Sequence, residues 1–215
     1  MLISSIISST KVEKGDFHMK TSDEIVKLAE ENNGIVTARM VTEAGLARGS
    51  LKHLADTGRL ERMSRGVYTL PDAWEDEFVS LQSRFGRGVY SHETALFLCD
   101  LTDRTPARMS MTFPGTYNTT SPKKEGISCT SAREPLYAMG ITQLETPGGN
   151  LVRAYCAERT LCDMLRTRSH TDVQVVVEAL RRYVARRDRD IPLLSEYAGA
   201  LRVDGKLRPF MEVLL

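Results

Sequence analysis

The sequence lacks the features that mark membrane-spanning, zinc-binding and disulfide-stabilised proteins. No apolar run approaches the roughly 20 residues that a membrane helix needs. Its four cysteines form no Cys-x-x-Cys pair and no cluster with histidine at zinc-ligand spacing. Four cysteines in 215 residues are also weak evidence for a disulfide framework. We therefore expect no membrane segment, no metal site, and a reduced protein of the cytoplasm.

Motifs for phosphate-bearing cofactors are missing as well. The chain has no Gly-x-x-x-x-Gly-Lys-Ser/Thr loop and no strand-borne Gly-x-Gly-x-x-Gly, so we expect no cofactor. It also lacks a strong charge excess, since 29 Lys and Arg face 28 Asp and Glu for a net charge of +1. A nucleic-acid surface would therefore have to be local. A hydrophobic content of 41% supplies a core for one large domain or two small ones.

Residues 1–18 show no organised periodicity. Their apolar stretch is interrupted by Ser4, Ser5, Ser8 and Ser9, and no Lys or Arg precedes it, which makes a poor signal peptide. Regular spacing of apolar residues begins only after Met19. We interpret residues 1–18 as a disordered leader, or as sequence outside the protein if translation starts at Met19 rather than Met1.

Residues 19–72 have the order of elements of a winged helix-turn-helix. Apolar spacing predicts a first helix that ends at Asn32-Asn33-Gly34, and a second that Thr37 caps. Gly45 permits the turn before a third helix over residues 47–57. Two short strands over residues 59–63 and 67–71 follow, joined by a tight turn. This segment is predicted to be the DNA-binding domain.

The remaining chain reads as a connecting helix and a second domain, which makes the predicted fold class α+β. Residues 73–88 carry Trp74, Phe78, Leu81 and Phe85 at helical spacing, so one face of this helix should pack on a neighbour. Residues 89–215 are predicted to form a mixed α/β C-terminal domain. We expect a helix that Ser91 caps and that ends at Leu101, and strands near residues 109–113, 127–130, 141–146 and 151–155. Helices should follow from residue 157, including an apolar stripe that begins at Val173 and a helix over residues 191–201.

Basic side chains gather in the third helix and the hairpin. Residues 46–66 hold five cations against two acids, whereas the first helix holds four acids. A helix with exposed donors near its N-terminus can enter the DNA major groove, and basic residues on the hairpin can then reach the DNA backbone or the minor groove. The predicted DNA-contacting residues are Arg48, Ser50, Lys52, His53, Arg62, Ser64 and Arg65. The alternatives are that Arg59 pairs with Glu61 or Asp56, that His53 is only a solvated helix residue, and that the domain docks a protein or serves as a scaffold.

Three other groups of residues could carry chemistry, and each has a structural explanation. Residues 156–163 supply two carboxylates and a thiol, but Arg159 and Asp163 stand four apart on a predicted helix and can form an ion pair. His92-Glu93 is more typical of a helix start than of an acid–base pair. We therefore predict no catalytic residue. The cluster of arginines over residues 181–189 is interleaved with acids and indicates a solvated face, or an extension of a nucleic-acid footprint.

Two sets of residues resemble the AbiEi antitoxins, which are transcriptional regulators of the AbiE type IV toxin–antitoxin and phage-defence systems. The first set is Gly34-Ile35-Val36-Thr37, Ala44-Gly45-Leu46, Leu54, Gly58-Arg59-Leu60 and Arg65-Gly66-Val67-Tyr68. The second set lies in the C-terminal domain and consists of Tyr90-Ser91-His92-Glu93-Thr94-Ala95-Leu96, Leu101-Thr102 and Glu158-Arg159-Thr160-Leu161-Cys162-Asp163.

The resemblance implies a repressor of its own operon that is not an enzyme. Its partner would be promoter DNA with inverted repeats, with two copies of the chain on the two half-sites. The C-terminal domain would counter a nucleotidyltransferase-like toxin, encoded beside it, without a stable complex. Family C-terminal domains are often basic, whereas the later half here is nearly balanced, so nucleic-acid contact is not carried over to it. The residues fit both a preformed dimer and a monomer that pairs on DNA. Two rivals stay open, a nucleic-acid-processing enzyme with a targeting domain and a protein that binds the toxin directly.

Overall fold

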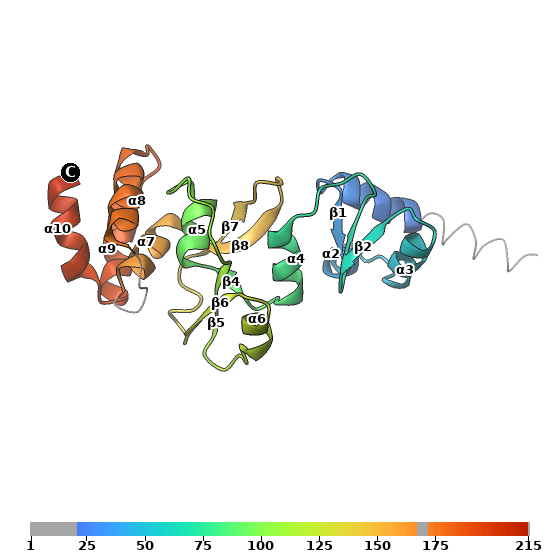
Figure 1. Cartoon of the computed structure of the whole chain (residues 1–215), viewed down its shortest axis with the longest axis horizontal. Coiled ribbons are helices and arrows are strands. Elements are labelled where there is room, and N and C mark those ends of the chain that lie inside the picture. The colour runs from blue at the N-terminus through green and yellow to red at the C-terminus, as the bar shows by residue number, and fades with distance from the viewer. Residues whose placement is uncertain (1–20, 167–171, 215) are drawn as a thin grey trace, which may run out of the picture. The chain divides into compact units, whose positions relative to one another are not determined.

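The computed structural model describes residues 21–166 and 172–214. They divide into two compact units, one of residues 21–84 with 147–150, and one of residues 85–146 with the described part of 151–215. The predicted leader over residues 1–18 lies outside the described residues. Figure 1 shows the elements of each unit along the chain.

The first unit has the arrangement of a winged helix-turn-helix, as predicted. Residues 21–30 are helical and are followed by β1 (Ile35–Thr37), α2 (Ala38–Glu43), α3 (Gly49–Asp56), β2 (Glu61–Ser64), β3 (Val67–Thr69) and α4 (Glu77–Arg84). The three strands form an antiparallel sheet in the order β1-β3-β2. The helices cover a small core whose buried members are Ile25, Ala29, Val36, Val41, Leu51, Leu54 and Leu60.

Local chemistry sets the helix-turn-helix corner. Thr37 is the N-cap of α2, where its Oγ1 accepts a hydrogen bond from Met40 N at 3.2 Å. After α2, Gly45 takes a φ of +72°, a backbone conformation that costs glycine little. Leu46 N then donates to Val41 O at 2.8 Å, which closes the turn before α3. The cap and the turn glycine were both predicted from the sequence.

The predicted connecting helix over residues 73–88 is longer than the observed α4. The Asp76 carboxylate accepts from Phe78 N at 2.9 Å and from Val79 N at 3.3 Å, so it caps a helix that begins at Glu77. Phe78 and Leu81 are buried, as their spacing predicted. Trp74 precedes the cap and is 92% exposed, so the expectation that it packs with them was wrong.

The second unit contains a mixed five-stranded sheet. Its elements are β4 (Val89–Tyr90), α5 (His92–Leu98), β5 (Ser110–Pro114), α6 (Thr120–Lys124), β6 (Ser128–Ala132), β7 (Ile141–Glu145) and β8 (Leu151–Tyr155). The strand order is β6-β5-β4-β8-β7. β4 is parallel to β8 and β5 is parallel to β6, whereas the β4–β5 and β7–β8 pairs are antiparallel. A mixed α/β architecture was predicted for this part of the chain.

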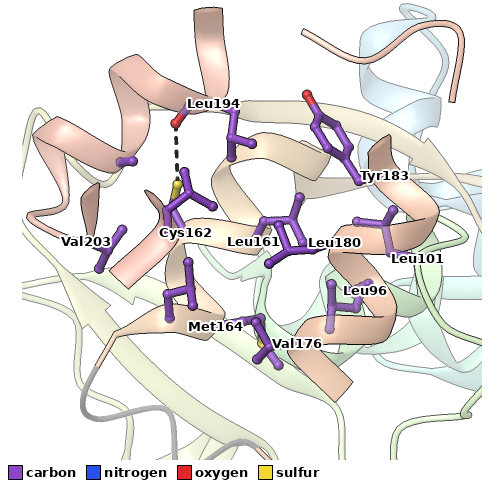
Figure 2. Packing of buried hydrophobic residues seen from close by; sticks show 14 of the residues in the cluster. Leu96, Leu101, Leu161, Cys162, Met164, Val176, Leu180, Tyr183, Leu194 and Val203 are labelled. Atoms are coloured by element: carbon purple, nitrogen blue, oxygen red, sulfur yellow. Dashed lines mark hydrogen bonds between the residues drawn. The ribbon is translucent and has the colours of Figure 1, made fainter. Parts of the chain in front are cut away.

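Helices α7 (Ala157–Leu165), α8 (Val173–Ala185), α9 (Ile191–Ala200) and α10 (Asp204–Leu214) complete the second unit beside this sheet (Figure 1). Together with α5 they enclose its main hydrophobic core, shown in Figure 2. Leu161 and Leu180 lie at the middle of the cluster in this view. Cys162 Sγ donates to Leu194 O at 3.7 Å and so joins α7 to α9 within the core.

Several details of the second unit differ from the predictions. Ser91 occupies the N-cap position of α5, but its side chain makes no capping hydrogen bond, because Ser91 Oγ accepts from Thr112 Oγ1 at 3.0 Å instead. The helix ends at Leu98 rather than Leu101. Val173 is exposed, and Ala179 and Tyr183 are buried on α8 in its place. Helices α6 and α10 were not predicted, since proline and glycine disfavour helices on propensity alone.

Candidate nucleic-acid interface

Helix α3 separates a buried face from a basic exposed face. Leu51 and Leu54 point into the core of the first unit. Lys52 and His53 are exposed on the opposite face, together with Asp56 at the C-terminal end. The first turn holds no acidic residue. The N-terminal half of the exposed face therefore combines cationic side chains with the positive end of the helix dipole.

Arg48 stands directly before α3, at its N-cap position, and is exposed. Its Nε donates a hydrogen bond to Thr42 Oγ1 on α2. This contact spans the turn between the two helices and holds the aliphatic part of Arg48 near the corner. A guanidinium in this position can still present its outer N–H groups to a phosphate oxygen.

The hairpin of β2 and β3 carries Arg62 and Arg65, both exposed. Arg62 lies opposite Tyr68, and the pairing shifts register between Arg62 and Ser64. The connecting turn uses Gly66 at a φ of +80°. Gly66 O accepts from Ala38 N at 2.8 Å, so the tip of the hairpin is tied to the start of α2. The basic residues of the hairpin are thereby held on a defined backbone.

The chain between α3 and the hairpin is short and well fixed. Arg59 N and Leu60 N both donate to Leu54 O, at 2.9 and 3.1 Å, so β2 starts close to the C-terminal half of α3. The Arg59 side chain turns to the first helix, where Nη2 donates to Asp23 Oδ1 at 2.8 Å. Arg59 therefore does pair with an acid, but the partner is Asp23 and not Glu61 or Asp56.

Some cations of the first unit are paired with acids and others are not. Within the described part of the first unit, ion pairs join Lys27 to Glu31, Arg39 to Glu43 and Arg59 to Asp23. None of Arg48, Lys52, Arg62 and Arg65 has an acidic partner among the described residues. We refer to these four residues as the basic face. An unpaired cluster of this kind attracts a polyanion.

Two of the predicted contact residues are placed differently. Ser50 is fully buried on α3, and its Oγ has no hydrogen-bond partner in the described structure, so it cannot contact a base edge. Its spacing of four from buried Leu54 was the signal that it faces the core. Ser64 is half-buried, and its Oγ lies 3.3 Å from Ser80 Oγ on α4. The structure thus leaves Arg48, Lys52, His53, Arg62 and Arg65 as accessible candidates.

The arginines over residues 181–189 are largely engaged within the protein. Arg182 forms ion pairs with Asp103 and Glu178, and its hydrogen bond holds the pKa of the Asp103 carboxyl below its usual range. Arg186 donates to Asp188 and to Cys99 O at 2.9 Å, and lowers the pKa of Asp188 to about 2. These pairings favour a solvated face over an extended nucleic-acid footprint.

The motif over residues 158–163 lies in the interior of the second unit. Arg159 Nε donates to Asp163 Oδ2 at 2.9 Å, which confirms the predicted ion pair. Glu158 Oε1 accepts from Tyr183 Oη at 2.8 Å. Burial raises the pKa of the Cys156 thiol to about 11 and that of Cys162 to about 12. These thiols are poor nucleophiles at neutral pH.

Over residues 21–166 and 172–214, no three His, Cys, Asp or Glu side chains come together in a way that could hold a metal ion. In the same ranges, no helix has the length and apolar character required to cross a bilayer.

Comparison with known proteins supports the assignment of the first unit. Residues 23–71 match the model of a family described as transcriptional regulator, AbiEi antitoxin. No curated protein sequence matches the chain. Among solved structures, the Rv2827c protein of Mycobacterium tuberculosis has a similar fold, with a TM-score of 0.52 and 16% identity over 91% of this chain and 80% of that one. The family match agrees with the resemblance seen in the sequence over residues 23–71, where the chain is similar to the AbiEi antitoxin transcriptional regulators.

Proposed function

We propose that this protein is a DNA-binding autorepressor and the antitoxin of a type IV toxin–antitoxin system. In this account the first unit binds promoter DNA that carries inverted repeats. The second unit is needed to counter a nucleotidyltransferase-like toxin without forming a stable complex with it. The proposal assigns the protein no catalytic residue and places it in the cytoplasm with its DNA.

The observation that carries the DNA-binding part is the basic face. Arg48, Lys52, Arg62 and Arg65 are exposed and have no acidic partner among the described residues, and they lie on the elements that contact DNA in winged domains. Other cations of the same unit, such as Arg39 and Lys27, are paired with acids. A protein-docking face has little need for this sorting of charge.

The elements suggest distinct contacts. A helix the width of α3 fits the major groove, which is about 12 Å wide, and Lys52 and His53 on its exposed face would reach base edges or phosphates. Arg48, at the helix start, would contact a phosphate. Arg62 and Arg65 on the hairpin would contact the backbone or the adjacent minor groove. Two copies bound to inverted repeats would read the two half-sites.

A binding assay with a repression assay tests this proposal. The DNA upstream of the protein's own gene is titrated with wild type, Lys52→Gln, Arg65→Gln and the control Lys27→Gln, in the presence of unrelated competitor DNA. Lys27 is a suitable control because it is exposed but already paired with Glu31. We expect each basic-face variant to weaken binding about tenfold and to derepress a promoter fusion, and Lys27→Gln to do neither. Equal affinity of all four proteins would refute the assignment.

The antitoxin part needs a separate test. Co-expression with the neighbouring toxin should restore growth, and the two proteins should not co-purify as a stoichiometric complex. A stable complex would favour direct neutralisation instead. Turnover of labelled DNA or RNA with a divalent metal, abolished by Glu158→Gln or Asp163→Asn in folded protein, would favour the rival enzyme.

A further inference from the structure

Helix α2 carries an exposed hydroxyl that is not among the predicted contact residues. Thr42 lies in the last turn of α2. Its Oγ1 donates a hydrogen bond to Ala38 O at 2.8 Å, one helical turn earlier. The same oxygen accepts a hydrogen bond from Arg48 Nε, across the turn that leads to α3. Because the hydroxyl proton is already used, the Thr42 oxygen serves Arg48 only as an acceptor.

This hydrogen bond constrains the Arg48 side chain. The guanidinium is planar, so a hydrogen bond at Nε limits the orientation of the whole group. The N–H groups on Nη1 and Nη2 make no hydrogen bond or ion pair with any described residue. An arginine in this state can offer parallel N–H groups to two oxygens of a phosphate. The contact with Thr42 therefore holds Arg48 without using the N–H groups that would meet DNA.

The same threonine is connected to the hairpin turn through Ala38. Ala38 N donates to Gly66 O at 2.8 Å, while Ala38 O accepts from Thr42 Oγ1. Thr42 therefore stands between Arg48 and the backbone that holds the hairpin turn. Arg65, another member of the basic face, directly precedes Gly66. The start of α3 and the hairpin are thus joined by hydrogen bonds that meet on α2.

Thr57 shows what a threonine does at a helix end without such a contact. It is exposed at the end of α3, where its Oγ1 donates to His53 O at 2.9 Å, four residues earlier. Its second contact, with Leu54 O at 3.2 Å, also lies within α3. No arginine of the described chain donates to it. The hydrogen bond from Arg48 is therefore what distinguishes Thr42.

We propose that Thr42 is a positioning residue for DNA binding, which holds the Arg48 guanidinium in the orientation that meets a DNA phosphate. The inference rests on the DNA-binding function proposed above and extends it to a residue that carries no charge. Binding a flexible arginine to a phosphate costs side-chain conformational freedom, and a side chain held in place beforehand loses less. Removal of the hydroxyl should therefore weaken the Arg48 contact although the charge of the basic face is unchanged.

Titration of the full-length protein against the DNA upstream of its own gene tests this role at several salt concentrations. The variants are Thr42→Val, Thr42→Ser, Arg48→Gln and the double variant of Thr42→Val with Arg48→Gln. Valine has nearly the shape of threonine but no hydroxyl, whereas serine keeps the hydroxyl. Thr57→Val is the matched control, because it removes the same kind of hydrogen bond to a helix carbonyl. Thermal unfolding verifies that each variant is folded. NMR of the arginine side chains follows the exchange of the Arg48 Nε–H in the free protein.

We expect Thr42→Val to weaken binding about fivefold and Arg48→Gln about tenfold. The double variant should bind no more weakly than Arg48→Gln alone, because both substitutions remove the same contact. The slope of log K against log salt concentration should fall by up to about 0.9 in Thr42→Val, although this substitution removes no charge. Thr42→Ser and Thr57→Val should keep the affinity and slope of the wild type. The Arg48 Nε–H should exchange faster in Thr42→Val than in the wild type.

The inference is overturned if Thr42→Val binds as the wild type does, or if its effect adds in full to that of Arg48→Gln. It is also overturned if Arg48→Gln binds as the wild type does, or if the Arg48 Nε–H exchanges equally fast with and without the hydroxyl. In these cases the wild type still binds the DNA. If the wild type itself does not bind, the proposed function fails together with this role, so the two failures are distinguishable.

Discussion

Arg159 Nε donates to Asp163 Oδ2 at 2.9 Å between side chains that are only 1% and 3% exposed. The same guanidinium stacks over the Tyr155 ring at 4.3 Å and donates to two carbonyls of the segment between β6 and β7. A charge pair this deep is tolerated only where further contacts offset the loss of hydration, and here the two carbonyls and the Tyr155 ring supply such contacts to Arg159. The motif that invited a catalytic interpretation is therefore part of the core of the second unit.

Asp163→Asn should strongly destabilise the second unit, because it leaves the buried Arg159 charge without its acid. The expected loss is about 3–5 kcal/mol in the free energy of unfolding, measured by urea denaturation. The matched control is Glu43→Gln, which breaks the Arg39–Glu43 pair at the same spacing and 2.7 Å, but at 73% and 58% exposure. Its expected cost is about 0.5 kcal/mol or less. Similar losses in the two variants would contradict this account.

Gly34→Ala should destabilise the first unit. Gly34 has a φ of +81°, and an added Cβ would lie 2.4 Å from Ala73 Cβ. Strain and the clash together should cost about 1–3 kcal/mol in thermal or urea unfolding. Gly49→Ala on α3 is the control, since an added Cβ there meets nothing within 4 Å. It should leave the stability unchanged or raise it by up to about 1 kcal/mol. If Gly34→Ala leaves the free energy of unfolding unchanged, the turn at residue 34 can relax to accommodate the added Cβ, which contradicts this prediction.

Ser50→Ala should leave DNA affinity unchanged. Ser50 Oγ is buried and has no hydrogen-bond partner in the described structure, so its removal should be neutral or stabilise the protein by up to about 1 kcal/mol. Fluorescence anisotropy and thermal unfolding measure the two quantities. Weaker DNA binding at unchanged stability would instead show that Ser50 contributes to DNA contact.

The pH dependence of stability should report on His92. Burial lowers its pKa in the folded protein, so below the ordinary value of about 6.5 the unfolded chain binds more protons than the folded one. The stabilisation from the neutral imidazole is therefore present above that value and is lost as the pH falls through the lowered pKa. We expect the free energy of unfolding to fall less between pH 7 and 5 for His92→Asn than for wild type. If the two proteins show the same dependence of unfolding free energy on pH, burial does not lower the pKa of His92 in the folded protein.

The sequence was sufficient for the parts of the fold that depend on local signals. Thr37 and Gly45 specify the helix-turn-helix corner through capping and a positive φ, and both can be recognised without neighbours. The start of α4 was missed because apolar spacing around Trp74 outweighed the weaker signal of Asp76 as a cap. Val173 was wrongly included in the apolar stripe of α8, because the sequence does not show which helices pack against α8.

The site was predictable to a similar degree. Charge sorting indicated the exposed cations of α3 and the hairpin, and their contact with DNA stays a prediction. Ser50 was included although its spacing from Leu54 indicates a buried position. The hydrogen bonds that Ser91 makes with Thr112 and His92 were not predicted, because β5 lies beside β4 only in the folded chain. Contacts between residues so distant in sequence depend on strand pairing, which local patterns do not specify.

The salt dependence of promoter binding tests the central claim most directly. The slope of log K against log salt concentration is measured for wild type, for the triple variant Arg48→Gln, Lys52→Gln, Arg65→Gln, and for Lys27→Gln. If the basic face contacts phosphates, the triple variant should lose about 0.9 in slope for each contact removed, and Lys27→Gln should match wild type. A triple variant with unchanged slope and affinity would contradict the claim that the basic face contacts DNA phosphates. It would favour a docking or scaffold function for the winged domain.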